Sequence, residues 1–246
     1  MGKERLDVLT VARGLAESRE QAQRFILAGD VFVNGHPMFK AGMKVATDAS
    51  LRARARSRYV SRGGEKLEGA FTAFSDWRVD SLQGIDVGAS TGGFTDCLLA
   101  HGAAHVIAVD VGRGQLHARL RDDPRVTVME RFNVRHLQPT DLPYVPAFAV
   151  FDVSFISLEL VMPPVVAVLG ENAELVTLIK PQFEAGRGEV GKGGVVRDQK
   201  TRDHVLAKVR AFGENKLSLD WLGCEVSPLT GPAGNVEYLA WWRKTS

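Results

Sequence analysis

The feature that most constrains the fold is a glycine-rich turn between Gly88 and Gly93. An apolar, strand-like run over 82–88 leads into this turn, and a helix is predicted over 92–100. A strand, a glycine-rich turn and a helix in this order allow a nucleotide to approach the backbone closely. The dinucleotide fingerprint GxGxxG would need glycine at position 90, where the chain has Ser90, so an NAD site is disfavoured.

Apolar runs alternate with helical segments in the rest of the chain. A helix is expected over 64–75, and further strand-like runs lie at 104–111, 125–129, 147–153, 174–180, 217–226 and 235–243. Strands interleaved with helices imply a mostly parallel sheet that is covered on both faces. The expected fold class is therefore α/β, with a Rossmann-like sheet.

Basic residues are concentrated in the first quarter of the chain. Residues 1–66 carry 13 Lys and Arg against 7 Asp and Glu, a net charge of +6, whereas residues 67–246 carry 18 against 22, a net charge of −4. A basic module on a mildly acidic body suggests contact with a polyanion, although an ordinary solvated surface is the alternative. We expect two domains, residues 1–60 and residues 61–246.

The first sixty residues are predicted to form a small α+β domain. Two helices are expected over 4–16 and 18–29, followed by a hairpin turn at Asn34-Gly35 and a short strand over 44–51. The segment 52–62 is rich in arginine and is a linker, an exposed edge strand or a contact for phosphates.

This N-terminal pattern resembles the S4 RNA-binding domain. The resemblance rests on RLD at residues 5–7, GDV at 29–31 and VNG at 33–35. It implies contacts with RNA phosphates. The candidate RNA-binding residues are Arg5, Arg19, Arg24, Lys44 and Arg62.

Composition argues against membrane and secreted proteins. No apolar run reaches the roughly 20 residues that span a bilayer, and the N-terminus lacks the apolar core of a signal peptide. The two cysteines, Cys97 and Cys224, show no metal-binding spacing. We therefore expect a cytoplasmic protein that uses no metal and does not enter a membrane.

The turn itself resembles a cofactor motif. DVGASTGGFTD, residues 86–96, is similar to the first motif of class I methyltransferases, where the turn lies against the methionine part of S-adenosylmethionine. Asp110 ends the next strand and can accept hydrogen bonds from ribose hydroxyls, although it could instead cap a helix. The resemblance implies S-adenosylmethionine as the cofactor, bound by Asp86, Gly88, Ala89, Ser90, Thr91, Gly92, Gly93, Phe94, Asp110, Asp152 and, on the adenine side, Asn133.

Four charged residues lie at the ends of predicted elements. They are Lys66, Asp152, Lys180 and Glu237. Asp152 and Lys180 end strands, and ligands of open α/β sheets bind at the carboxyl ends of parallel strands. Taken singly, Lys66 could be a surface helix residue, Asp152 a cap and Glu237 an exposed strand position. The ordered Lys–Asp–Lys–Glu set is more specific than its members.

The whole chain is similar to one family. The segments SRGGEKL, DVGASTGGFTD, FDVSFISL, IKPQFEAGR, GGVVRD and SPLTGPAGNVEYL together resemble TlyA-type proteins, which join an S4 domain to an FtsJ-like methyltransferase domain and are known as haemolysin A or as ribosomal RNA 2′-O-methyltransferases. The resemblance implies methylation of a cytidine ribose in ribosomal RNA or a ribosomal subunit. The alternatives are a membrane-active haemolysin and an RNA-binding or ribosome-assembly factor whose methyltransferase domain is inactive.

The chemistry of ribose methylation suggests a role for each of the four residues. A 2′-hydroxyl must lose its proton as it attacks a methyl group, and a lysine can accept that proton only when its amine is neutral. Burial and a second nearby cation favour the neutral amine. We therefore expect Lys180 to accept the proton, Lys66 to supply the second cation, Asp152 to orient Lys180, and Glu237 to position Lys66 or the ribose.

Overall fold

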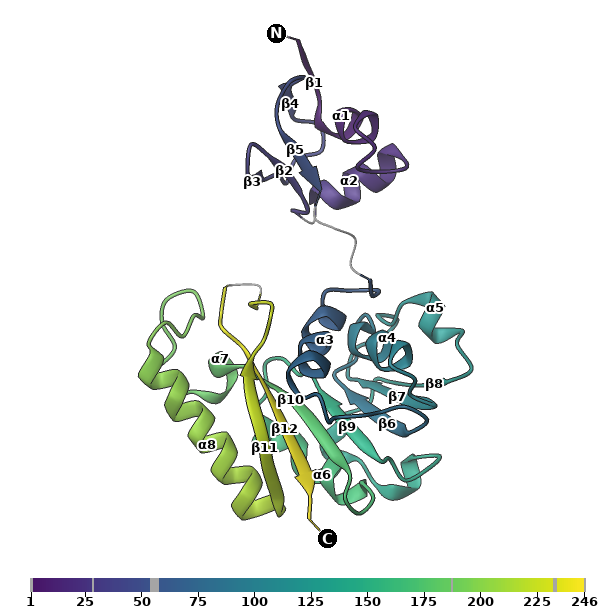
Figure 1. Ribbon diagram of the computed structural model, residues 1–246, viewed down its shortest axis with the longest axis vertical. Helices are drawn as coiled ribbons and strands as arrows, with labels where there is room; N and C mark the ends of the chain where they lie inside the picture. Colours follow the sequence, from purple (N-terminus) through teal and green to yellow (C-terminus); the bar gives the residue numbers. More distant parts are fainter. Residues whose placement is uncertain (1, 28, 54–57, 187, 232–233, 246) are drawn as a thin grey trace. The chain divides into compact units, whose positions relative to one another are not determined.

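The computed structural model describes residues 2–27, 29–53, 58–186, 188–231 and 234–245. The chain forms two compact units, residues 1–56 and residues 57–246. Both are drawn in Figure 1.

The larger unit is built on a sheet of seven strands. In spatial order these are β11 (Leu219–Val226), β12 (Tyr238–Lys244), β10 (Glu174–Ile179), β9 (Phe148–Phe151), β6 (Gln83–Val87), β7 (His105–Asp110) and β8 (Val126–Glu130). Five neighbouring strands, β10, β9, β6, β7 and β8, pair in parallel. Strand β12 is antiparallel to both of its neighbours, β10 and β11. The mostly parallel α/β sheet expected from the sequence is confirmed.

Helices cover both faces of this sheet. One face carries α3 (Gly63–Ala73), α4 (Gly93–Ala100) and α5 (Ala118–Arg121), and the other carries α6 (Leu158–Val168) and α8 (Gln199–Leu217). The 3₁₀ turns η1 (Val134–His136) and η2 (Pro139–Asp141) follow β8, and the short α7 (Pro181–Glu184) follows β10.

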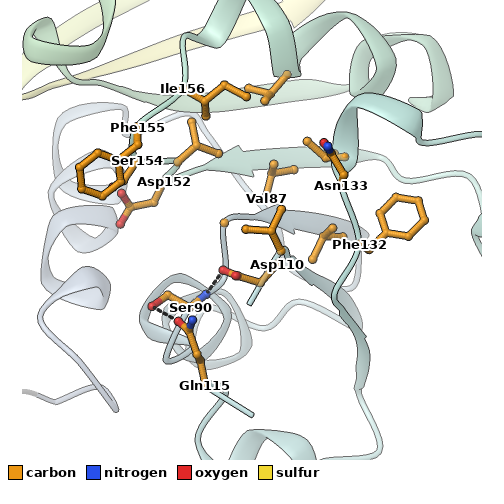
Figure 2. A pocket seen from close by; sticks show the side chains of 16 residues that line it. Val87, Ser90, Asp110, Gln115, Phe132, Asn133, Asp152, Ser154, Phe155 and Ile156 are labelled. Atoms are coloured by element: carbon orange, nitrogen blue, oxygen red, sulfur yellow. Dashed lines mark hydrogen bonds between the residues drawn. The ribbon is translucent and has the colours of Figure 1, made fainter. Parts of the chain in front are cut away.

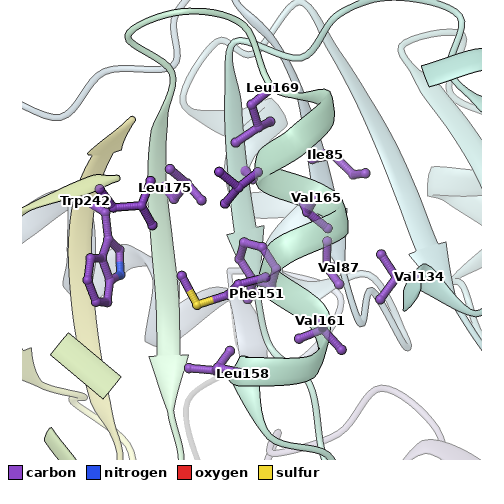
Figure 3. Packing of buried hydrophobic residues seen from close by; sticks show 14 of the residues in the cluster. Ile85, Val87, Val134, Phe151, Leu158, Val161, Val165, Leu169, Leu175 and Trp242 are labelled. Carbon is purple, nitrogen blue, oxygen red and sulfur yellow. The ribbon is translucent and has the colours of Figure 1, made fainter. Parts of the chain in front are cut away.

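The strand pleat divides the apolar residues between two cores. In β7, Ile107 and Val109 pack on the side of α6, whereas Val106 and Ala108 pack on the side of α3 and α4. Figure 3 shows the first core, where Val161 and Val165 of α6 lie over the strands beside Phe151. Because both faces are buried, the strands read in the sequence as continuous apolar runs.

Parallel pairing brings the carboxyl ends of the five strands from β10 to β8 to one edge of the sheet. The backbone N–H of Asp152, just past β9, donates to the Val87 carbonyl at the end of β6 at 3.0 Å. Strand β12 runs the opposite way, and Tyr238 at its start pairs with Ile179 at the end of β10. Glu237, just before β12, therefore lies at the same edge of the sheet as Lys180, just after β10.

The N-terminal unit has its own small core. It contains β1 (Lys3–Arg5), α1 (Leu6–Ala12), α2 (Arg19–Leu27), β2 (Val31–Val33), β3 (His36–Pro37), β4 (Lys44–Ala46) and β5 (Leu51–Ala53), packed around Leu6, Leu9, Ile26, Val31, Val33, Val45 and Ala49. The Asn34-Gly35 turn is confirmed, since both residues have positive φ and Val33 pairs with His36.

Two expectations for this unit are corrected. The first helix begins at Leu6, because Lys3–Arg5 instead pairs as a strand with β4. In place of the single strand expected over 44–51 there are two strands in different sheets: β4 pairs with β1, and β5 pairs with β2. Residues 54–57 of the arginine-rich segment lie outside the described residues.

Candidate active site

Two adjoining cavities open at the edge where the parallel strands end. The first, about 380 Å³, lies between the glycine-rich turn, Asp110, Phe132–Val134 and Ser154–Ile156. The second, also about 380 Å³, lies between α3, the same turn, Lys180 and Glu237. Both cavities are lined by Gly88, Ser90, Asp152, Ser154 and Phe155, so they meet at Asp152.

The glycine-rich turn is held against the end of β9. Gly88 has φ of +85°, and a Cβ there would lie 2.7 Å from the Asp152 carbonyl oxygen, so only glycine fits without a shift. Ser90 is also left-handed, and its backbone N–H donates to Oδ2 of Asp110 at 2.8 Å (Figure 2). The turn therefore presents its backbone to the first cavity.

Asp110 is a fixed acceptor on the wall of the first cavity. Its Oδ1 accepts the Gly112 N–H at 2.6 Å while Oδ2 accepts that of Ser90. No helix starts directly after it, since α5 begins at Ala118 and is capped by His117, so the helix-cap alternative does not hold. A carboxylate has about four acceptor positions, so two remain available to a ligand.

Two residues expected to bind the cofactor lie outside both cavities. Asp86 is fully buried beneath the turn and accepts a hydrogen bond from the Thr95 hydroxyl at 2.6 Å, and burial raises its pKa to about 7. Gly92 has φ of +94°, and a Cβ there would lie 2.3 Å from Leu120. Both residues shape the turn, and their direct contact with a cofactor stays a prediction. Ala89, Thr91, Gly93 and Phe94 line the second cavity rather than the first.

The four charged residues form two ion pairs on the wall of the second cavity. Lys180 Nζ lies 2.6 Å from Oδ1 of Asp152, and Lys66 Nζ lies 2.5 Å from Oε2 of Glu237. The Glu237 side chain is 1% exposed and that of Lys66 is 12% exposed. The structure thus brings together all four residues expected from the sequence, but it gives Lys66 a carboxylate partner that offsets its charge.

Ser154 is a further member of this group that sequence reasoning missed. Lys180 Nζ donates to its hydroxyl oxygen at 2.9 Å, so the amine is held by two partners. The only signal was its position two residues after Asp152. The Lys180 side chain, 8% exposed, is therefore oriented as well as buried.

Asn133 and Phe155 shape the mouth of the first cavity. The Asn133 side-chain oxygen accepts the Arg135 backbone N–H at 3.2 Å and caps η1, and Asn133 lines the first cavity. Phe155 has φ of +63° and is 90% exposed, and its ring centroid lies 5.0 Å from that of Phe183. A large apolar side chain in that conformation is costly, which points to a functional surface.

The candidate RNA-binding residues differ in their surroundings. Arg5 and Arg19 both bond to Asp7, whose side chain is fully buried. The Arg5 guanidinium holds the pKa of that carboxyl well below its usual range. Arg24 and Lys44 are exposed, and Arg62 is exposed at the start of α3, on the rim of the second cavity.

Comparison with known proteins fits this geometry. Residues 59–244 match the FtsJ-like methyltransferase family, and residues 4–50 match the S4 domain. The chain is 48% identical over 244 residues to the 16S/23S rRNA (cytidine-2′-O)-methyltransferase TlyA of Mycobacterium tuberculosis, covering 97% of this chain and 89% of that protein. This chain belongs to the TlyA family.

Two other similar proteins align with nearly the whole of this chain. Hemolysin A of Brachyspira hyodysenteriae is 43% identical and is covered to 98%, with 96% of this chain aligned. A solved structure from Streptococcus thermophilus has a TM-score of 0.79 at 45% identity, covering all of this chain and 90% of that one. The family expected from the sequence motifs is confirmed.

Proposed function

We propose that this chain transfers a methyl group from S-adenosylmethionine to the 2′-hydroxyl of a cytidine in ribosomal RNA. The observation that carries the proposal is the meeting of Lys66, Asp152, Lys180 and Glu237 on one cavity that adjoins the cavity at the glycine-rich turn. The rRNA cytidine activity named for the 48% identical relative supports the choice of substrate. This substrate would place the protein in the cytoplasm, on rRNA or a ribosomal subunit.

The residues of the first cavity fit S-adenosylmethionine. Gly88 gives the backbone approach that an extended methionine part needs, Asp110 offers acceptors to ribose hydroxyls, and the Asn133 amide offers a donor to adenine. When bound, this cofactor supplies an electrophilic methyl group. Because the cavities meet at Asp152, a ligand in the first can present that group to a nucleotide in the second.

In this proposal Lys180 takes the proton of the 2′-hydroxyl. Asp152 and Ser154 fix its amine on the cavity wall, which supplies the orientation that general-base catalysis needs. Lys66 of α3 and Glu237, the residue just before β12, would hold the ribose by hydrogen bonds. This arrangement needs no metal ion.

The N-terminal unit would supply affinity for RNA. Its match to the S4 domain and the exposed Arg24 and Lys44 support this role. In the described part of the chain, no helix is long and apolar enough to cross a membrane, and no observation favours membrane lysis over methylation.

One experiment tests the proposal directly. Sites of 2′-O-methylation are mapped on ribosomal RNA from cells with the gene, without it, and complemented with Lys180→Ala. We expect one cytidine to be methylated in cells with the gene and unmethylated in cells without it. The wild-type protein should restore this methylation, and Lys180→Ala should not. An unchanged map would instead favour an RNA-binding factor without enzyme activity.

A further inference from the structure

The side-chain oxygen of Gln182 is a buried acceptor that receives no hydrogen bond from the part of the chain that the structure describes. Gln182 lies in the first turn of α7, two residues after Lys180, and lines the second cavity. Its Oε1 is buried and has no hydrogen-bond partner among the described residues. Buried polar atoms are nearly always paired, because an unpaired one is expensive. A donor is therefore expected from the molecule that fills this cavity.

The backbone that carries Gln182 is firmly anchored. Glu184, at the end of the same short helix, accepts the Ser157 hydroxyl at 2.6 Å and the Leu158 N–H at 2.8 Å. Lys208 of α8 also donates to the Glu184 carbonyl at 3.3 Å. These contacts tie α7 to α6 and α8 and so fix the backbone of Gln182 beside the second cavity.

The position of Gln182 assigns its partner to the RNA. It does not line the first cavity, where we place the cofactor. A nucleotide within RNA has its 3′ and 5′ oxygens in phosphodiesters, so its remaining donors are the 2′-hydroxyl and those of the base. The 2′-hydroxyl is taken by Lys180 in the proposed reaction, which leaves a donor on the base.

We propose that Gln182 accepts a hydrogen bond from the 4-amino group of the target cytosine and so favours cytidine over uridine. This inference rests on the proposed function. Uracil has a carbonyl oxygen at the same position, which cannot donate a hydrogen bond and would leave the buried oxygen of Gln182 unpaired. Phe155 and Phe183 line the same cavity and offer a base an apolar surface beside this acceptor.

The test uses the full-length protein and a substrate with a single base change. Ribosomal RNA carrying either cytidine or uridine at the mapped position is expressed in cells that lack the gene. It is presented both as deproteinised RNA and as the assembled subunit. Gln182→Met removes the acceptor at nearly constant size, and Gln182→Glu keeps an acceptor. Gln199→Met, on the exposed start of α8, is the matched control.

We expect the wild type and Gln199→Met to methylate cytidine about 10-fold to 100-fold faster than uridine, the value of one buried hydrogen bond. In Gln182→Met this preference should shrink to within about 3-fold, mainly through a slower cytidine reaction, while Gln182→Glu retains a preference for cytidine. Cofactor affinity by calorimetry should be unchanged in all variants.

Different results would overturn the role of Gln182 and the proposed function. A full preference for cytidine in Gln182→Met, or loss of cofactor affinity together with equal losses on both substrates, would overturn the role of Gln182 alone. So would a wild type that does not discriminate between the two bases. Absence of any 2′-O-methylation by the wild type would overturn the proposed function and this inference with it.

Discussion

The amine of Lys180 lies 2.6 Å from the carboxylate of Asp152, at the point where the two cavities meet. If Lys180 accepts the proton of the 2′-hydroxyl, Lys180→Arg and Lys180→Ala should both reduce methyl transfer by about 10²-fold to 10⁴-fold, since arginine stays protonated at accessible pH. Single-turnover rates with saturating RNA isolate the chemical step from binding. Cofactor affinity, measured in parallel, should change little.

A role for Lys180 as a fixed positive charge predicts a different result. The arginine variant would then keep much of the wild-type rate, while the alanine variant would lose it. Substantial turnover by Lys180→Arg would therefore leave Lys180 as a positioning group.

The buried pair of Lys66 and Glu237 predicts an asymmetry between stability and activity. Glu237→Gln leaves the Lys66 amine without its carboxylate and should destabilise the larger unit by about 3–5 kcal/mol. Replacing both by apolar residues of similar size, Lys66→Met with Glu237→Leu, should recover most of that loss, because no buried charge remains unpaired. Urea unfolding measures the stability, and a double variant no more stable than Glu237→Gln would contradict this account.

The double variant at Lys66 and Glu237 should regain stability without regaining methyl-transfer activity. The apolar double variant lacks the groups that we assign to the ribose, so its single-turnover rate should remain as low as that of the single variant. Recovery of the rate together with stability would show that Lys66 and Glu237 serve the fold alone.

The sequence predicted most of the sheet and the composition of the site for a simple reason. Strands buried on both faces are long apolar runs, and parallel pairing places residues that follow such runs at one edge. Asp152 and Lys180 could therefore be placed together before the structure was known. Gly88 could be assigned because a strand that turns sharply into a helix needs a left-handed residue.

The sequence could not predict which charged residues pair with each other within the site. Lys66 and Glu237 are 171 positions apart, and the antiparallel register of β12 against β10 decides where Glu237 enters. The exposure of Phe155 depends on a left-handed backbone that an apolar pattern does not reveal. The burial of Asp86 likewise follows from packing beneath the turn, which its place in the sequence motif does not reveal.

Asp110 should control the affinity for S-adenosylmethionine. Asp110→Ala removes acceptors for ribose and also the two backbone bonds that hold Ser90 and Gly112, so binding should weaken by about 10-fold to 100-fold. Calorimetry measures the affinity, with Asp123→Ala, a loop acid paired to Arg125, as the control. Unchanged affinity in Asp110→Ala would remove Asp110 from the cofactor site.

The N-terminal unit should contribute RNA affinity without affecting the cofactor. The deletion should end at residue 56 rather than 60, because Tyr59 is buried in the larger unit and the Val60 N–H donates to Asp96 at 2.8 Å. Without residues 1–56, RNA binding should weaken and become less sensitive to salt, since phosphate contacts release counterions. Equal RNA affinity across a salt series would refute this role, and calorimetry with S-adenosylmethionine checks that the larger unit is intact.

The buried carboxyl of Asp86 should make the stability of the larger unit depend on pH. Burial raises its pKa to about 7, against about 3.9 in an unfolded chain. Between these values the native protein keeps a proton that the unfolded chain has lost. The stabilisation is therefore full below about pH 4 and declines as the pH rises to about 7, by at most about 1.4 kcal/mol per pH unit.

Asp86→Asn isolates this effect, because asparagine can still accept from Thr95 and stays neutral. The variant should lose less stability than the wild type between pH 5 and pH 7, and should be the more stable of the two at pH 8. Asp123→Asn is the control, because its partner Arg125 lowers the pKa of Asp123 and so confines its effect to acid conditions. Urea unfolding at pH 5, 6, 7 and 8 gives the comparison. Parallel curves for the wild type and Asp86→Asn would mean that Asp86 is ionised throughout this range, and that the turn tolerates its charge.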